Sequence, residues 1–157
     1  MRSIETKYFG TLLFGEESVF DFPQGLPAFE EEKGFVLIEP AEGAPLVFLQ
    51  SMLRPGLCFA AFPVLGVDPG YQLGIAPEDL EELGLDVRRQ PAHGSEVRVL
   101  ALLSLDGGFR ATANLMAPLV LDVKTRRGLQ AIRRDSRYSH QHPITAPAGE
   151  RTSEKAC

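Results

Sequence analysis

The chain has 157 residues and a formal net charge of −5, with 44% hydrophobic and 24% charged residues. This composition is typical of one soluble globular domain. The negative balance argues against nonspecific binding to nucleic acid and permits binding to a basic protein. No apolar run approaches the roughly 20 residues that span a bilayer, so we expect no membrane protein.

The cysteine content indicates a reducing compartment. Cys58 lies inside an apolar run, and Cys157 is the last residue. No signal peptide precedes them, so we expect two reduced thiols in a cytoplasmic protein.

The N-terminal part of the chain predicts short strands separated by turns. Apolar and polar residues alternate over residues 4–14, with a bulge expected at Gly10. A strand over residues 19–22 stops at Pro23. Residues 29–33 suit one short helical turn.

Three further strands and one helix are predicted in the middle of the chain. The strands cover residues 35–38, 46–50 and 57–62. The last two are almost wholly apolar, so we place them in the middle of a sheet, covered on both faces. The helix covers residues 77–83, with a proline and two acidic residues in its first turn and Gly84 closing it.

Two hairpins are predicted toward the C-terminus. Residues 97–105 and 109–115 are joined by an Asp-Gly-Gly turn at 106–108. Residues 119–123 then pair with residues 129–132.

About nine strands with short connections predict an all-β class, as a compact, single-domain β-barrel-like fold with one short helix. We assign residues 1–144 to the domain. Residues 145–157 are small and polar, and we expect a disordered tail.

The sequence predicts no catalytic, cofactor or metal site. It has no Gly-x-Ser-x-Gly elbow and no phosphate-binding loop with its lysine. His140 and His142 would share one face of a strand, but no third ligand is spaced suggestively. A solvated C-terminal segment is the simpler interpretation of this pair.

Positive charge gathers near the C-terminal end, at Arg126, Arg127, Arg133, Arg134 and Arg137. A nucleic-acid binder on a small barrel would interleave such residues with exposed aromatics, and only Tyr138 lies nearby. We favour the alternative, in which Arg126 and Arg127 occupy an exposed hairpin turn, and we expect no direct nucleic-acid partner.

The candidate partner-binding residues are Asn114, Leu115, Met116, Ala117 and Pro118. Pro118 cannot donate a ladder hydrogen bond, which indicates an edge or a bulge. The Asn114 amide suits a partner's backbone, and the next three residues offer an adaptable apolar surface. In the alternative interpretation, Leu115 or Met116 is core and Asn114 holds the bulge together.

Six segments in this order resemble the flagellar assembly factor FliW family: IETKYFG (4–10), FPQGLPAFE (22–30), LEELG (80–84), TANLMAP (112–118), KTRRG (124–128) and SRYS (136–139). The chain departs from the family at Ala28, where glycine is usual, and at Arg133 and Arg134, where an acidic residue is frequent.

The resemblance implies a non-enzymatic regulator with a β-barrel-like fold. Such proteins bind the RNA-binding translational regulator CsrA, relieve its repression of flagellin synthesis, and also bind flagellin. We therefore expect residues 114–118 to dock on CsrA, with flagellin competing. The alternatives are a chaperone that binds only flagellin, a small-barrel flavin enzyme lacking a recognisable phosphate cluster, and a direct RNA binder.

Overall fold

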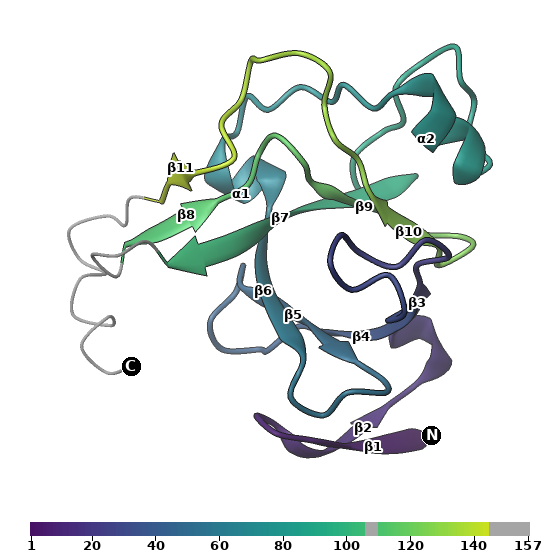
Figure 1. Ribbon diagram of the computed structural model, residues 1–157, viewed down its shortest axis with the longest axis vertical. Coiled ribbons are helices and arrows are strands. Elements are labelled where there is room, and N and C mark those ends of the chain that lie inside the picture. The colour runs from purple at the N-terminus through teal and green to yellow at the C-terminus, as the bar shows by residue number, and fades with distance from the viewer. Residues whose placement is uncertain (106–109, 145–157) are drawn as a thin grey trace.

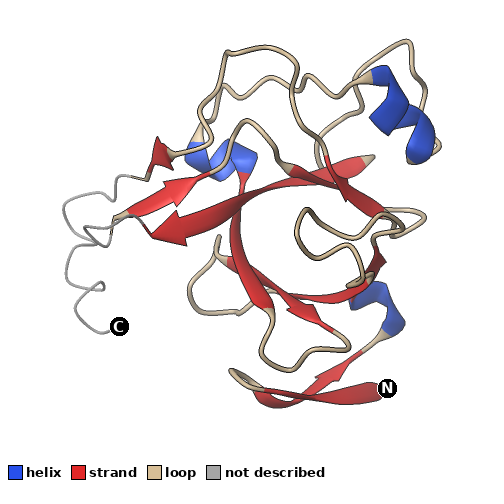
Figure 2. Cartoon of the chain, in the orientation of Figure 1, coloured by secondary structure: helices blue, strands red, loops and turns tan. Residues whose placement is uncertain are grey.

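The protein is described from a computed structural model, which covers residues 1–105 and 110–144 (Figure 1). Strands and loops dominate these residues, and the helices are short (Figure 2). The predicted all-β class is therefore confirmed. No helix in the described part of the chain is long and apolar enough to cross a membrane.

One curved antiparallel sheet forms most of the fold. Its strand order is β10-β9-β7-β6-β5-β4-β3. The strands span Val19–Asp21 (β3), Gly34–Ile38 (β4), Val47–Ser51 (β5), Cys58–Pro63 (β6), Val97–Leu105 (β7), Leu119–Asp122 (β9) and Gly128–Gln130 (β10). β8 (Ala111–Ala113) pairs with the end of β7, and the two-residue β11 (His142–Pro143) pairs with β8. Both predicted hairpin pairings are confirmed, although β8 and β10 are shorter than expected.

The curved sheet brings its two end strands together without closing a barrel (Figure 1). One parallel bridge links Asp21, at the end of β3, to Arg127, just before β10. The Asp21 N–H donates to the Arg126 carbonyl at 2.8 Å. We call the line between β3 and β10 the seam.

Two apolar clusters lie on opposite faces of β7 and β9. Inside the curve, Leu100 and Leu119 pack with phenylalanines such as Phe22 and Phe35. On the other face, Val97, Val99 and Val120 pack under the segment that carries α2. This alternation along β7 and β9 has the two-residue period of a strand buried on both sides.

The predicted helix is confirmed as α2 (Pro77–Glu82). Pro77 opens it, and Gly84 follows it with a φ of 75°. Leu80 and Leu83 are almost fully buried in the outer cluster, and this packing stabilises a helix of barely two turns.

The prediction of one bulged strand over residues 4–14 is wrong. These residues form a hairpin of β1 (Arg2–Thr6) and β2 (Gly10–Phe14), a sheet of its own. Gly10 has a φ of 63°, which favours glycine, and pairs with Thr6 across the turn. A hairpin and a bulge share the same alternation of side chains, so the pattern did not separate them.

The helical turn predicted over residues 29–33 is one hydrogen-bonded turn, in which the Glu32 N–H donates to the Phe29 carbonyl at 3.0 Å, and these described residues form no helix. Just before it, Leu26 and Phe29 form a bridge around a tight turn, with hydrogen bonds in both directions. Ala28 lies in this turn with a φ of 71°, a left-handed conformation that glycine adopts more easily.

Three other points complete the comparison with the sequence. The prediction did not include α1 (Val64–Val67) or the 3-10 turn η1 (Glu16–Ser18). β5 and β6 do lie in the middle of the sheet, but most β6 residues are only half-buried. The predicted turn at 106–108 and the predicted tail at 145–157 lie outside the described residues.

Candidate partner-binding site

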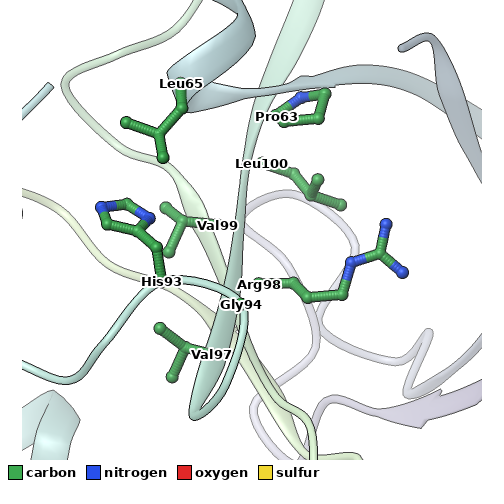
Figure 3. A pocket seen from close by; sticks show the side chains of 8 residues that line it. All are labelled: Pro63, Leu65, His93, Gly94, Val97, Arg98, Val99 and Leu100. Atoms are coloured by element: carbon green, nitrogen blue, oxygen red, sulfur yellow. The ribbon is translucent and has the colours of Figure 1, made fainter. Parts of the chain in front are cut away.

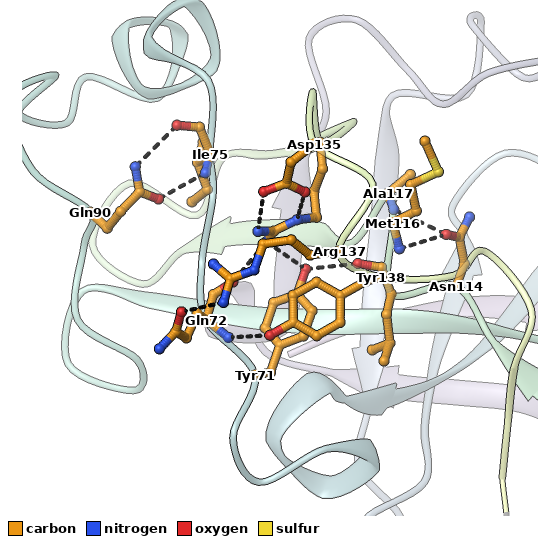
Figure 4. A network of polar contacts seen from close by, with 12 residues as sticks. Tyr71, Gln72, Ile75, Gln90, Asn114, Met116, Ala117, Asp135, Arg137 and Tyr138 are labelled. Atoms are coloured by element: carbon orange, nitrogen blue, oxygen red, sulfur yellow. Dashed lines mark hydrogen bonds and ion pairs between the residues drawn. The ribbon is translucent and has the colours of Figure 1, made fainter.

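The segment from Asn114 to Pro118 connects β8 to β9 and forms a closed turn. The half-exposed Asn114 accepts hydrogen bonds at Oδ1 from the N–H groups of Met116 and Ala117, at 3.1 and 3.0 Å (Figure 4). This is the local turn that an asparagine side chain stabilises. The alternative interpretation, in which Asn114 holds the backbone together, is therefore correct.

Leu115 cannot be a surface contact, and this part of the prediction is wrong. Its side chain is 0% exposed and belongs to the outer cluster. Its N–H donates to the Ser139 carbonyl at 3.0 Å, and its own carbonyl accepts from the Tyr71 hydroxyl at 2.8 Å. A partner could reach the Leu115 side chain only after the cluster opened.

The rest of the segment is tied to residues 130–133. The Met116 carbonyl accepts from the Arg133 N–H at 2.9 Å, and the Pro118 carbonyl accepts from the Ala131 N–H at 2.8 Å. The sequence indicated an edge or a bulge at Pro118, and because Pro118 is buried it marks no open sheet edge. Asn114, Met116 and Ala117 remain half-exposed and can offer surface to a partner.

A buried arginine fixes the outer side of this turn. Arg133 is 5% exposed, and its guanidinium carbon lies 5.3 Å from the Tyr71 ring centroid and 4.7 Å from the Tyr138 ring centroid. Its Nε and Nη2 donate to the Asp135 carboxylate at 2.8 and 2.9 Å, and its Nη1 donates to the Gln72 carbonyl at 2.7 Å. The charge is thus both paired and hydrogen-bonded, as a buried charge must be.

This arginine joins two segments that are about 60 residues apart in sequence. The Tyr138 hydroxyl accepts from the Gln72 N–H at 3.0 Å, and Arg137 donates to the Gln72 side chain at 2.7 Å. A Cβ at Gly74 would lie 2.6 Å from the Arg133 guanidinium, so a larger residue there would displace the guanidinium.

Charge and burial alter the titration of this network. The Arg133 guanidinium lowers the pKa of Asp135 below its usual value. Burial raises the pKa of Tyr71, although Arg133 opposes this. Both groups therefore keep the charge state that supports the arginine at neutral pH.

The basic residues near the C-terminus lie in different surroundings. Arg133 is in the interior, and Arg134 forms an ion pair with Glu78 of α2. Arg126 and Arg127 lie in the turn between β9 and β10, as favoured. Tyr138 is half-buried and its hydroxyl is bonded, so it offers no free stacking platform.

The described residues enclose a hollow on the sheet. One hollow of about 160 Å³ lies on β7 and is lined by Pro63, Leu65, His93, Val97, Val99 and Leu100 (Figure 3). Burial lowers the pKa of His93, and Arg98 at the rim donates to Glu39 at 2.8 Å. Across the described ranges, no three His, Cys, Asp or Glu side chains are placed to hold a metal ion.

Comparison with known proteins assigns the chain to a family. The family model described as "FliW protein" matches residues 3–144. The chain belongs to the FliW family.

Individual FliW proteins are similar over nearly the whole domain. The flagellar assembly factor FliW of Syntrophomonas wolfei is 40% identical over 139 residues, which are 88% of this chain and 85% of that protein. The Bacillus subtilis protein of the same name is 32% identical over 142 residues, covering 90% and 95%. A crystal structure of the flagellar assembly factor FliW superposes with a TM-score of 0.76 at 32% identity, covering 92% of this chain and 98% of that one.

Proposed function

We propose that this FliW-family protein is a non-enzymatic regulator of flagellar assembly that binds CsrA, relieves its repression of flagellin synthesis, and has flagellin as a competing partner. The observation that carries the proposal is the match to the FliW family over residues 3–144. The net charge of −5 supports it, because an acidic protein is steered toward a basic RNA-binding partner.

The turn at residues 114–118 offers fewer residues to a partner than the sequence predicted. Asn114, Met116 and Ala117 present half-exposed atoms, and Ile132 beside them is 58% exposed. Because Leu115 and Arg133 fix the backbone from beneath, this surface is preorganised for a partner. We therefore assign the contact with CsrA to Asn114, Met116 and Ala117.

The test is a titration of flagellin into a preformed complex of this protein with CsrA, followed by fluorescence anisotropy of labelled CsrA. A sensor of flagellin needs each ligand to lower the affinity for the other, and that coupling is reciprocal. We expect flagellin to release CsrA. A stable ternary complex with unchanged CsrA affinity would contradict the switch, and would favour a chaperone that binds only flagellin.

A further inference from the structure

We propose that the seam holds a second docking groove, for an extended basic segment of a partner protein. The groove has a volume of about 260 Å³ and lies between β10, the loop after β3, and α2. Its lining includes Gln24, Pro27, Glu30, Asp79, Glu82 and Gln130. We call it the seam groove.

The seam opens because of one proline. Asp21 donates to Arg126 in the parallel bridge at the end of β3. Donors alternate along a parallel ladder, so the next donor on this strand would be residue 23. That residue is Pro23, which has no N–H, and the chain instead turns away through a hydrogen bond of 2.7 Å from the Gly25 N–H to the Phe22 carbonyl.

Beyond the bridge at Arg127, the opening leaves one edge of β10 without a strand partner. Ala131 and Arg133 donate to Pro118 and Met116, so the odd-numbered residues bond toward β9. In an antiparallel ladder the backbone groups of the alternate residues, Gln130 and Ile132, then point to the other side. β10 stands at the end of the strand order, and no described strand pairs with that side. Gln130 is half-exposed and Ile132 is 58% exposed, so a partner can reach this edge.

The charge of the groove selects the occupant. Three carboxylates line it, from Glu30, Asp79 and Glu82, and no lining residue is basic. Burial, followed by the charge of Glu82, raises the pKa of Asp79, as expected for a partly buried carboxylate beside a second carboxylate. Among the described residues, Glu82 accepts a hydrogen bond only from a neutral donor, the Gln24 amide at 2.9 Å. A partner's guanidinium would give a stronger, charge-assisted bond.

Size and shape favour a peptide segment over a small molecule. The groove is smaller than the roughly 300–1,000 Å³ of ordinary small-molecule sites. An extended segment could instead bond to Gln130 and Ile132 through its backbone, as in β-strand addition, and extend a basic side chain between α2 and the loop. Backbone pairing would supply affinity, and the carboxylates would supply the preference for lysine or arginine.

The test uses a fluorescein-labelled hexapeptide of alternating arginine and valine, measured by fluorescence anisotropy on the whole protein. We expect the double variant Asp79→Asn with Glu82→Gln to weaken binding at least tenfold. The matched control is Glu17→Gln with Glu42→Gln, which removes the same charge from two exposed positions outside the groove. We expect the control to change binding less than threefold, and thermal melting of both variants confirms that they are folded.

A second peptide separates pairing at the edge from simple charge attraction. It has the same sequence with alternate backbone nitrogens methylated, in both registers. One of the two registers methylates the nitrogens that would donate to β10. We expect that peptide to bind at least tenfold more weakly than the unmethylated peptide. Equal affinity of methylated and unmethylated peptides would overturn the role of the β10 edge. Equal loss in the groove variant and its control, or no binding of the arginine peptide, would overturn the groove itself.

Discussion

Pro118 and Pro23 lie next to strands of the sheet, but only Pro23 leaves a strand edge unpaired. Pro118 lies in a buried turn, and its carbonyl accepts from Ala131. Pro23 follows β3 at the seam, where its missing N–H ends the pairing with the segment that leads into β10. A proline therefore opens the edge of the neighbouring strand only where no other segment covers that strand.

The largest expected effect separates the buried part of the Asn114 turn from its surface. Leu115→Ala should reduce the free energy of unfolding by about 2–5 kcal/mol, because Leu115 is fully buried. Met116→Ala is the control, since Met116 is half-exposed, and it should cost clearly less. Urea unfolding measures both. Equal small losses would mean that Leu115 is not core, and would restore it as a contact residue.

The next effect concerns the arginine that fixes the same turn. Arg133→Ala should destabilise the protein by about 2–4 kcal/mol, because it leaves a void beside the Tyr71 and Tyr138 rings and an unbonded Gln72 carbonyl. Arg134→Ala, at the neighbouring exposed ion pair, should change stability by less than about 1 kcal/mol. Similar losses in the two variants would contradict the different roles given to these residues.

A smaller effect sharpens the description of the seam loop. Ala28 adopts a φ of 71° there, so Ala28→Gly should stabilise the protein by about 0.5–1 kcal/mol after the entropy cost of glycine. Ala41→Gly is the matched change at an exposed residue without positive φ, and it should lower stability. Differential scanning calorimetry gives both values. A lower melting temperature for Ala28→Gly would show that the turn is not strained.

The smallest expected effect is the loss of stability when Glu96 is replaced, because this carboxylate is paired, unlike the carboxylates of the seam groove. Hydrogen bonds from Arg89 and from the Ala92 N–H lower the pKa of Glu96 from its ordinary 4.5 to about 2. A lowered pKa of an acid gives stability that is present above pH 4.5 and is lost as the pH falls toward 2. Glu96→Gln should therefore melt below the wild type at pH 7, and the difference should close between pH 4.5 and 2. Melting curves across this pH range measure the difference, with Glu42→Gln as control. A difference in melting temperature that did not change with pH would contradict the pairing of Glu96 with Arg89.

The sequence predicted the pairing of strands that are neighbours in the chain better than the contacts between distant segments. Apolar runs bounded by turn residues predicted β4, β5 and β6, and hairpin turns predicted β7 and the pairing of β9 with β10, because these signals depend on neighbours in sequence. The interior position of Arg133 was missed, since arginine is usually exposed and its partner Tyr71 lies 62 residues away. The seam was missed for a similar reason. Pro23 was correctly predicted to end a strand, but the edge that this leaves open belongs to β10, more than 100 residues later.

Amide hydrogen exchange of the free protein, resolved by NMR, tests the contrast between the closed turn and the open seam most directly. The account predicts slow exchange at Leu115, Ala131 and Arg133, whose N–H groups are bonded within the described fold. It predicts fast exchange at Gln130 and Ile132, whose N–H groups face the seam. Protection of Gln130 and Ile132 comparable to that of Ala131 would contradict an open edge on β10, and fast exchange at Leu115 would contradict a closed turn at residues 114–118.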